Sequence, residues 1–101
     1  MSKNPFELPI DRKFSREELA EALRIAIIAE LDAINLYLQF AKAIEDERFR
    51  KVFLDIAKEE KTHVGEFLSL LEILDKEQVE ELKAGREEVK ELTGFREIPN
   101  P

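Results

Sequence analysis

Prolines occur only near the two ends of the chain, at Pro5, Pro9, Pro99 and Pro101. Proline interrupts a helix because it has no backbone N–H and its ring clashes with the preceding turn. Between these ends the chain has no proline, and its apolar residues recur at spacings of three and four, which is the period of a helix. The interior of the chain therefore predicts an all-α fold built from long helices.

The first long helix has a distinct start signal. Ser15 followed three residues later by Glu18 is a capping box, in which each side chain accepts a backbone N–H of the other residue. Nothing interrupts the helix from there to about Ala43. A short polar break follows, with Asp46 as the N-cap of a second helix that extends to about Leu74. Two helices of nearly 30 residues joined by a short turn predict an antiparallel hairpin.

A shorter and more polar helix is expected after the hairpin. Asp75 and Gln78 match a second capping box, which opens a helix that extends to about Leu92. Gly85 marks a place where this helix can be interrupted, and Gly94 is suited to end it. The sequence therefore predicts a hairpin followed by one C-terminal helix.

The predicted helices leave a short non-helical segment at each end of the chain. We expect an extended arm over residues 1–14, the helical hairpin with its C-terminal helix over residues 15–94, and a tail over residues 95–101. Apolar residues alternate along the arm, which predicts that one side of it is covered: Phe6, Leu8 and Ile10.

Each long helix carries one apolar stripe with the spacing of a coiled-coil seam. The stripe of the first helix contains Leu23, Ile27, Glu30, Ile34, Tyr37, Ala41 and Ile44. The stripe of the second helix contains Phe49, Phe53, Ile56, Glu60, His63, Phe67, Leu70 and Leu74. We expect both stripes to be buried, so the ionisable residues within them need an explanation.

These ionisable residues are Glu30 in the first stripe and Glu60 with His63 in the second. Burying a carboxylate is costly unless it is paired or bound to a metal. Glu60 and His63 share one face of their helix, because three residues make nearly one turn. Glu30 precedes Glu45 by 15 residues and Glu60 follows it by 15. The hairpin should bring both carboxylates to the same height, about 22 Å from the turn, which predicts a metal site.

One hairpin supplies half of a di-iron carboxylate centre. The complete centre takes two single Glu residues and two Glu-x-x-His pairs from four helices. A twofold dimer repeats the same residues around its axis, so two hairpins would complete the centre within a ferritin-like four-helix bundle. The predicted cofactor is a di-iron pair with one ion per chain, and four carboxylates balance the charge of two ferrous ions.

The same residues allow other interpretations. Glu30 can be a buried polar residue that fixes helix register in a non-catalytic helical assembly module. The three ligands can also hold a structural zinc or manganese ion in a dimer. Tyr37, two turns from Glu30, is placed to hydrogen-bond a ligand carboxylate or to supply an electron, and an amphipathic core position explains it equally well.

Composition excludes several other classes of protein. The chain of 101 residues has no Cys, so it has no disulfide, thiolate-bound cluster or thiol nucleophile. Its formal net charge of −7 gives no basic surface for nucleic acid or an anionic membrane. The sequence has no apolar run near the roughly 18 residues of a membrane span and no signal-peptide core. We therefore expect a cytoplasmic protein with neither nucleic acid nor membrane as a partner.

Two segments resemble the encapsulated ferritin-like proteins. They are Ile27–Tyr37 and Glu59–His63, which hold Glu30 and Glu60 at the 30-residue separation found in that family. The resemblance covers about residues 15–94. It implies a ferroxidase that oxidises Fe(II) to Fe(III) with O₂ at a di-iron site between two chains. It further implies a ring-shaped decamer inside an encapsulin nanocompartment, whose shell protein is the partner and which stores the iron.

The resemblance also assigns residues. It places the metal ligands at Glu30, Glu60 and His63, and adds Tyr37 to these three as the nearby tyrosine of the catalytic site. Members of the family have an outer metal-uptake site with acidic residues on both sides of the first-helix ligand. Those places hold Ala29 and Asp32 here, so only Asp32 is carried over as a residue of that site.

Overall fold

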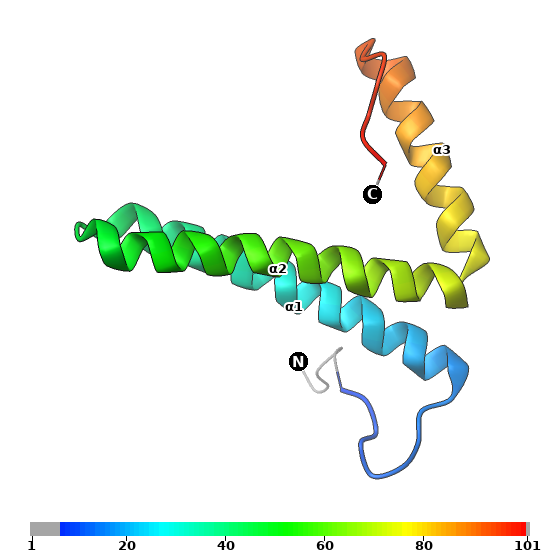
Figure 1. Ribbon diagram of the computed structural model, residues 1–101. Coiled ribbons are helices and arrows are strands. Elements are labelled where there is room, and N and C mark those ends of the chain that lie inside the picture. Colours follow the sequence, from blue (N-terminus) through cyan, green and yellow to red (C-terminus); the bar gives the residue numbers. More distant parts are fainter. Residues whose placement is uncertain (1–6, 101) are drawn as a thin grey trace, which may run out of the picture.

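The computed structural model describes residues 7–100, which form three helices and no strand. They are α1 (Arg16–Ala43), α2 (Glu47–Leu74) and α3 (Lys76–Thr93). The first two lie side by side as an antiparallel hairpin, and α3 leads away from its open end (Figure 1). This confirms the predicted all-α class, the hairpin and the shorter C-terminal helix. Within residues 7–100, no helix is both long and apolar enough to cross a membrane.

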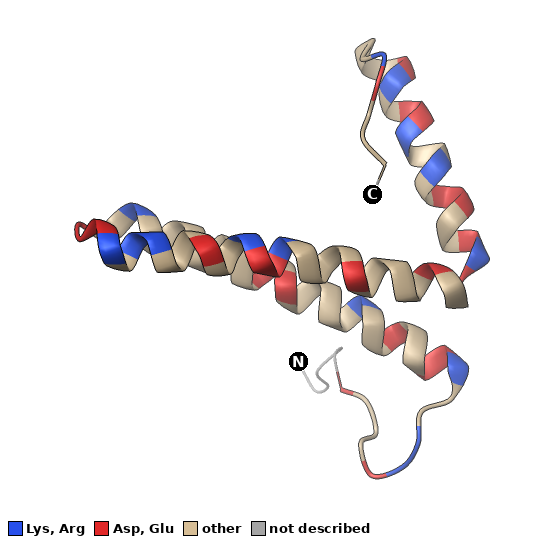
Figure 2. Cartoon of the chain, viewed as in Figure 1, with Lys and Arg blue, Asp and Glu red and all other residues tan. Residues whose placement is uncertain are grey.

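The three helices differ in how densely they carry charge. Acidic and basic residues follow one another closely along α3 and are sparser along α1 (Figure 2). The C-terminal helix is therefore the more polar one, as the sequence predicts.

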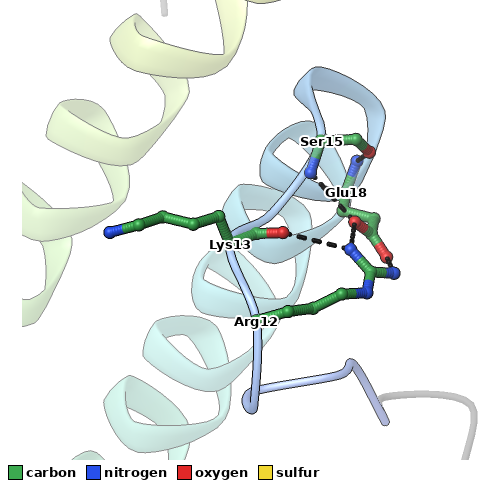
Figure 3. Close-up of polar contacts among 4 residues, drawn as sticks. All are labelled: Arg12, Lys13, Ser15 and Glu18. Atoms are coloured by element: carbon green, nitrogen blue, oxygen red, sulfur yellow. Dashed lines mark hydrogen bonds and ion pairs between the residues drawn. The ribbon is translucent and has the colours of Figure 1, made fainter.

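The predicted capping box at the start of α1 is present. The Ser15 hydroxyl accepts the Glu18 N–H at 3.1 Å, and a Glu18 carboxylate oxygen accepts the Ser15 N–H at 2.9 Å. The Arg12 guanidinium donates two further hydrogen bonds to the same carboxylate, at 2.7 and 2.8 Å (Figure 3). Mainly through this Arg12 contact, and secondly through the Ser15 N–H, the pKa of Glu18 falls from 4.5 to about 2.

The remaining helix ends follow the sequence with two corrections. Asp46 caps α2, and Gly94, at φ 78°, ends α3 as predicted. Asp75 caps α3 by accepting the Gln78 N–H, but its own N–H donates to the Leu71 carbonyl of α2, so the second half of the predicted capping box does not form. The break considered at Gly85 is also absent, because α3 is continuous through that residue.

The covered side of the arm was predicted wrongly. Ile10 is 90% exposed, so the alternating apolar residues do not share a buried side. Phe6 lies outside the described residues.

The core lies between α1 and α2 and is narrow. Its buried apolar residues are Leu23, Ile34, Ala41, Ala57 and Leu71. The three from α1 belong to the predicted stripe, whereas the two from α2 do not.

In α2, the prediction that Phe49 and Leu70 are buried is wrong, since they are 64% and 50% exposed. Phe49 lies in the first turn of α2, near the closed end of the hairpin. Leu70 points about 100° around the helix from the buried Leu71. The small side chain of Ala57 faces α1 instead and is 1% exposed.

A single chain leaves an unusually large surface uncovered. Its accessible surface is 8306 Å², whereas a compact protein of this mass exposes about 5,900 Å². Its radius of gyration is 17.2 Å, against about 13 Å for a compact domain of this length. Large apolar residues of the hairpin with more than a third of their surface exposed are Leu19, Ile28, Leu31, Leu36, Phe40, Phe49, Val52, Leu54, Leu70 and Ile73. Much of the apolar surface therefore remains available for contact with other chains.

Candidate metal centre

The hairpin brings Glu30, Glu60 and His63 together at its middle. Glu30 lies halfway along α1, and Glu60 and His63 lie halfway along α2. One ligand atom from each residue can be chosen so that all three lie within 4.8 Å of one another. Within residues 7–100 they form the one such group of His, Cys, Asp or Glu residues. The equal heights expected from the sequence are therefore present in the structure.

His63 holds the three side chains in one cluster. Its Nδ1 lies 3.3 Å from Glu30 Oε2 and 3.4 Å from Glu60 Oε2. Atoms that bind one metal ion at about 2.1 Å lie about 3.0–3.4 Å apart in octahedral or tetrahedral geometry. Carboxylate and imidazole are also the donors that iron, zinc and manganese accept. The residues present thus fit a divalent transition-metal ion without a large rearrangement.

The cluster is accessible from one side. The side chains of Glu30 and Glu60 are 20% and 18% exposed, whereas the imidazole of His63 is 43% exposed. Three donors are fewer than the four to six that these metals bind. A bound ion would therefore need further donors, which water or a second chain would supply.

Tyr37 lies apart from this cluster. It is seven residues beyond Glu30, about 10 Å along the helix axis. Its ring packs edge-on against Phe53, with centroids 6.1 Å apart, and Phe53 packs in the same way against Phe40 at 6.0 Å. Among the hydrogen bonds of residues 7–100, none involves the Tyr37 hydroxyl. Within one chain, Tyr37 therefore belongs to an aromatic cluster nearer the turn.

Asp32 does not join the three clustered residues either. It is exposed, and its position two residues after Glu30 turns it about 160° away around α1. The structure thus brings together three of the five residues singled out from the sequence and leaves Tyr37 and Asp32 outside the cluster.

Apolar residues that are at least partly exposed continue the line of His63 along α2. Phe49, Ile56, His63 and Leu70 follow one another at intervals of seven residues. A matching line on α1 contains Leu19, Ala26, Ala33 and Phe40. Leu19 and Leu70 line the same cavity of about 150 Å³, so the two lines meet on one side of the hairpin. We call this side the metal face. The sequence analysis missed it, although the seven-residue interval through His63 is visible in the sequence.

Comparison with protein families places this site in context. The family model described as Rubrerythrin matches residues 21–98, which include all three clustered residues.

Individual relatives give a more specific picture. A ferritin-like-encapsulin shell fusion protein of Pyrococcus furiosus is 63% identical over 95 residues, which are 94% of this chain and 28% of that protein. The chain thus spans just over a quarter of that relative. The encapsulin nanocompartment cargo protein EncC of Myxococcus xanthus is 37% identical over 90 residues, covering 89% of this chain and 69% of that protein.

A solved structure has the same fold. The crystal structure of the encapsulated ferritin domain from Pyrococcus furiosus is 61% identical and superimposes with a TM-score of 0.84. The match covers 96% of this chain and 99% of that domain. With a family model over most of its length and such relatives, the chain belongs to the rubrerythrin family of ferritin-like domains, as an encapsulated ferritin-like protein.

Proposed function

We propose that this chain is a ferroxidase, which binds Fe(II) as its substrate and transfers one electron from each ion to O₂. The observation that carries the proposal is the separation of 3.3 and 3.4 Å between His63 Nδ1 and the carboxylate oxygens of Glu30 and Glu60. Carboxylates suit both Fe(II) and Fe(III), because their negative charge compensates the added positive charge of the product.

A second copy of the chain completes the centre in this proposal. One chain offers two carboxylates and one imidazole, half of the ligand set of a di-iron carboxylate site. A twofold dimer across the metal face would bring together four carboxylates and two imidazoles around two ions, one ion per chain. The exposed apolar residues on that face and the large uncovered surface support such a dimer.

The three ligands have different tasks in the proposed site. Glu30 and Glu60 bind as carboxylates and neutralise the charge of the ions. His63 binds through Nδ1, which requires a neutral imidazole with its proton on Nε2. We assign Tyr37 to the catalytic site as a residue near the iron pair, and Asp32 to an outer metal-uptake site, as the family resemblance implies.

We infer that the reaction takes place in an encapsulin nanocompartment within the cytoplasm. One relative is named as a fusion with an encapsulin shell, and another as an encapsulin nanocompartment cargo protein. A ring-shaped assembly, a decamer, would present several iron pairs to the enclosed space. The shell protein would then retain the oxidised iron, for which one hairpin has no storage space.

An anaerobic titration with Fe(II) followed by exposure to O₂ tests the proposal. Binding should saturate near one ion per chain, and O₂ should then produce the near-ultraviolet absorbance of Fe(III) at many times the rate of protein-free buffer. Parallel titrations with Zn(II) and Mn(II) test the structural-metal alternative. Fe(II) oxidation no faster than in buffer would refute ferroxidase activity. If iron also failed to bind, a non-catalytic assembly module would be the better interpretation.

A further inference from the structure

Asp75 forms the entire connection between the hairpin and α3. It is the one residue between the end of α2 and the start of α3, and both helices use it as a cap. Its N–H donates to the Leu71 carbonyl of α2 at 2.9 Å, and its Oδ1 accepts the Gln78 N–H of α3 at 3.0 Å. The backbone torsions of Asp75 and the forces on its side chain therefore determine the direction in which α3 leaves.

The other carboxylate oxygen of Asp75 binds α1. Its Oδ2 pairs with the Arg24 guanidinium at 2.5 Å, and the side chains of Asp75 and Arg24 are 26% and 43% exposed. A single residue thus joins three helices: Asp75 binds α2 through its backbone N–H, α3 through Oδ1 and α1 through Oδ2.

Little else holds α3 in place within one chain. Among the described residues, α3 packs sparsely against α2 and makes no contact with α1. None of its residues is fully buried. The chain extends 47 and 45 Å along its two longest axes, as expected of a helix that projects from the hairpin (Figure 1). A contact of modest strength can therefore change the orientation of α3.

The Arg24–Asp75 pair lies on the side of the hairpin away from the metal face. It borders a cavity lined mainly by α1 residues Arg16, Glu17, Ala20, Glu21 and Arg24. The cavity on the metal face is lined by Leu19, Leu23, Leu70, Ile73 and Leu74, and Leu74 is the one residue that the two share. The contact that orients α3 therefore lies on the side of the hairpin that the proposed second chain would leave uncovered.

We propose that Arg24 is the latch that holds α3 in its projecting position, by fixing the carboxylate of the one-residue joint Asp75. With the latch open, α3 can turn about the joint, and its apolar residues Leu82 and Val89 can fold against the exposed apolar residues of the hairpin. A folded-back α3 would compete with a second chain for these apolar residues, and this consequence for assembly rests on the proposed function. The effect of Arg24 on the position of α3 does not depend on the proposed function.

Spin-label distances in the full chain test the latch. The chain has no Cys, so Asp55→Cys in α2 and Glu88→Cys in α3, both at exposed positions, place the two labels uniquely. The labelled chain is diluted into unlabelled parent protein, without added metal, so that pairs between chains do not contribute. The background variants are Arg24→Gln, Arg24→Lys and Asp75→Asn, where Asn keeps the cap but loses the charge. Arg50→Gln is the matched control, because it removes the exposed Arg50–Glu47 pair at the other end of the hairpin.

The parent should give one narrow distance distribution, which Arg50→Gln leaves unchanged. Arg24→Gln and Asp75→Asn should broaden it and raise the population outside the parent peak about fivefold, the effect of a partly exposed ion pair of about 1 kcal/mol. Arg24→Lys should largely restore the parent distribution. In the unsubstituted background, 1 M NaCl should broaden it as well, because salt screens exposed pairs.

Two outcomes would overturn the latch. One is an unchanged distribution in Arg24→Gln with unchanged helix content by circular dichroism. The other, which decides the matter if the variants unfold, is a parent distribution that does not respond to 1 M NaCl.

Discussion

His63 Nδ1 lies 3.3 Å from Glu30 Oε2, although 33 positions separate the two residues along the chain. Two helices of 28 residues each, joined by a three-residue turn, bring them together. The buried residues Ile34 and Ala57 hold the helices in contact near this height. Packing of the hairpin therefore brings Glu30, Glu60 and His63 together.

Replacing a single ligand should have a large effect on oxidation. Glu30→Ala, Glu60→Ala and His63→Ala should each lower the rate of Fe(II) oxidation by at least about 100-fold, because one substitution removes two ligands from a centre shared by two chains. Stopped-flow absorbance after mixing with O₂ measures the rate. Glu59→Ala is the control, since Glu59 is exposed and outside the cluster. Wild-type oxidation in Glu30→Ala would mean that Glu30 is not a ligand.

Glu30→Ala should not lower the thermal stability of the metal-free protein, although it should abolish most of the oxidation activity. Glu30 is 20% exposed and lies near a second carboxylate, so metal-free Glu30→Ala should be at least as stable as the metal-free parent. Thermal melts at one fixed protein concentration provide the comparison. A register-fixing role for Glu30 requires the contrary result, a lower melting temperature with disordered assembly and no loss of oxidation.

Metal should control assembly. Without it, the proposed interface confines four carboxylates that repel one another, so we expect monomers or weak dimers. Fe(II) removes this repulsion and adds its binding energy to association, so larger species should form. Sedimentation velocity under anaerobic conditions measures the shift, with His63→Ala as a control that should not respond. Identical mass distributions with and without Fe(II), in protein free of residual metal, would contradict the shared centre.

The start of α1 should be sensitive to acid. Because the pKa of Glu18 is about 2 in the folded chain and near 4.5 otherwise, its contribution to the free energy of unfolding is complete above about pH 4.5. It should disappear as the pH falls from 4.5 towards 2. Chemical denaturation of the parent and Glu18→Gln across this range measures the difference. A difference that stayed constant down to pH 2 would contradict the Arg12–Glu18 contact.

Two glycines of α3 should respond to substitution in opposite ways. Gly85 lies inside the helix, with open space where the methyl group of an alanine would lie, so Gly85→Ala should raise the free energy of unfolding by about 0.5–1 kcal/mol. Gly94 has a φ of +78°, so Gly94→Ala should lower it by about 1 kcal/mol. Denaturant titrations at equal protein concentration compare both variants with the parent. Destabilisation by Gly85→Ala would indicate that another chain approaches this glycine closely.

The features that could be predicted from the sequence are those determined by residues close together in the chain. The N-caps at Ser15, Asp46 and Asp75 depend on a few neighbouring residues and are present as expected. The cluster of Glu30 with Glu60 and His63 was also predictable, because in a hairpin equal distances from the turn give equal heights.

Packing between elements was harder to predict. The apolar stripe of α2 is wide, and periodicity does not distinguish residues that face α1, such as Leu71, from residues that face outward, such as Leu70. The Arg24–Asp75 pair forms only because α1 lies beside the residue that connects α2 to α3. The spacing of residues within a helix does not reveal this arrangement.

The equal heights of Glu30 and Glu60 also restrict how the chain can change in length. One residue inserted between Glu30 and the end of α1 would rotate Glu30 by about 100° and shift it about 1.5 Å relative to the turn. It would point away from His63, and the same holds for an insertion between the start of α2 and Glu60. Insertions in the arm or the tail leave these positions unaffected. Length variation in the arm or the tail is therefore compatible with the site, whereas variation between either carboxylate and the turn is not.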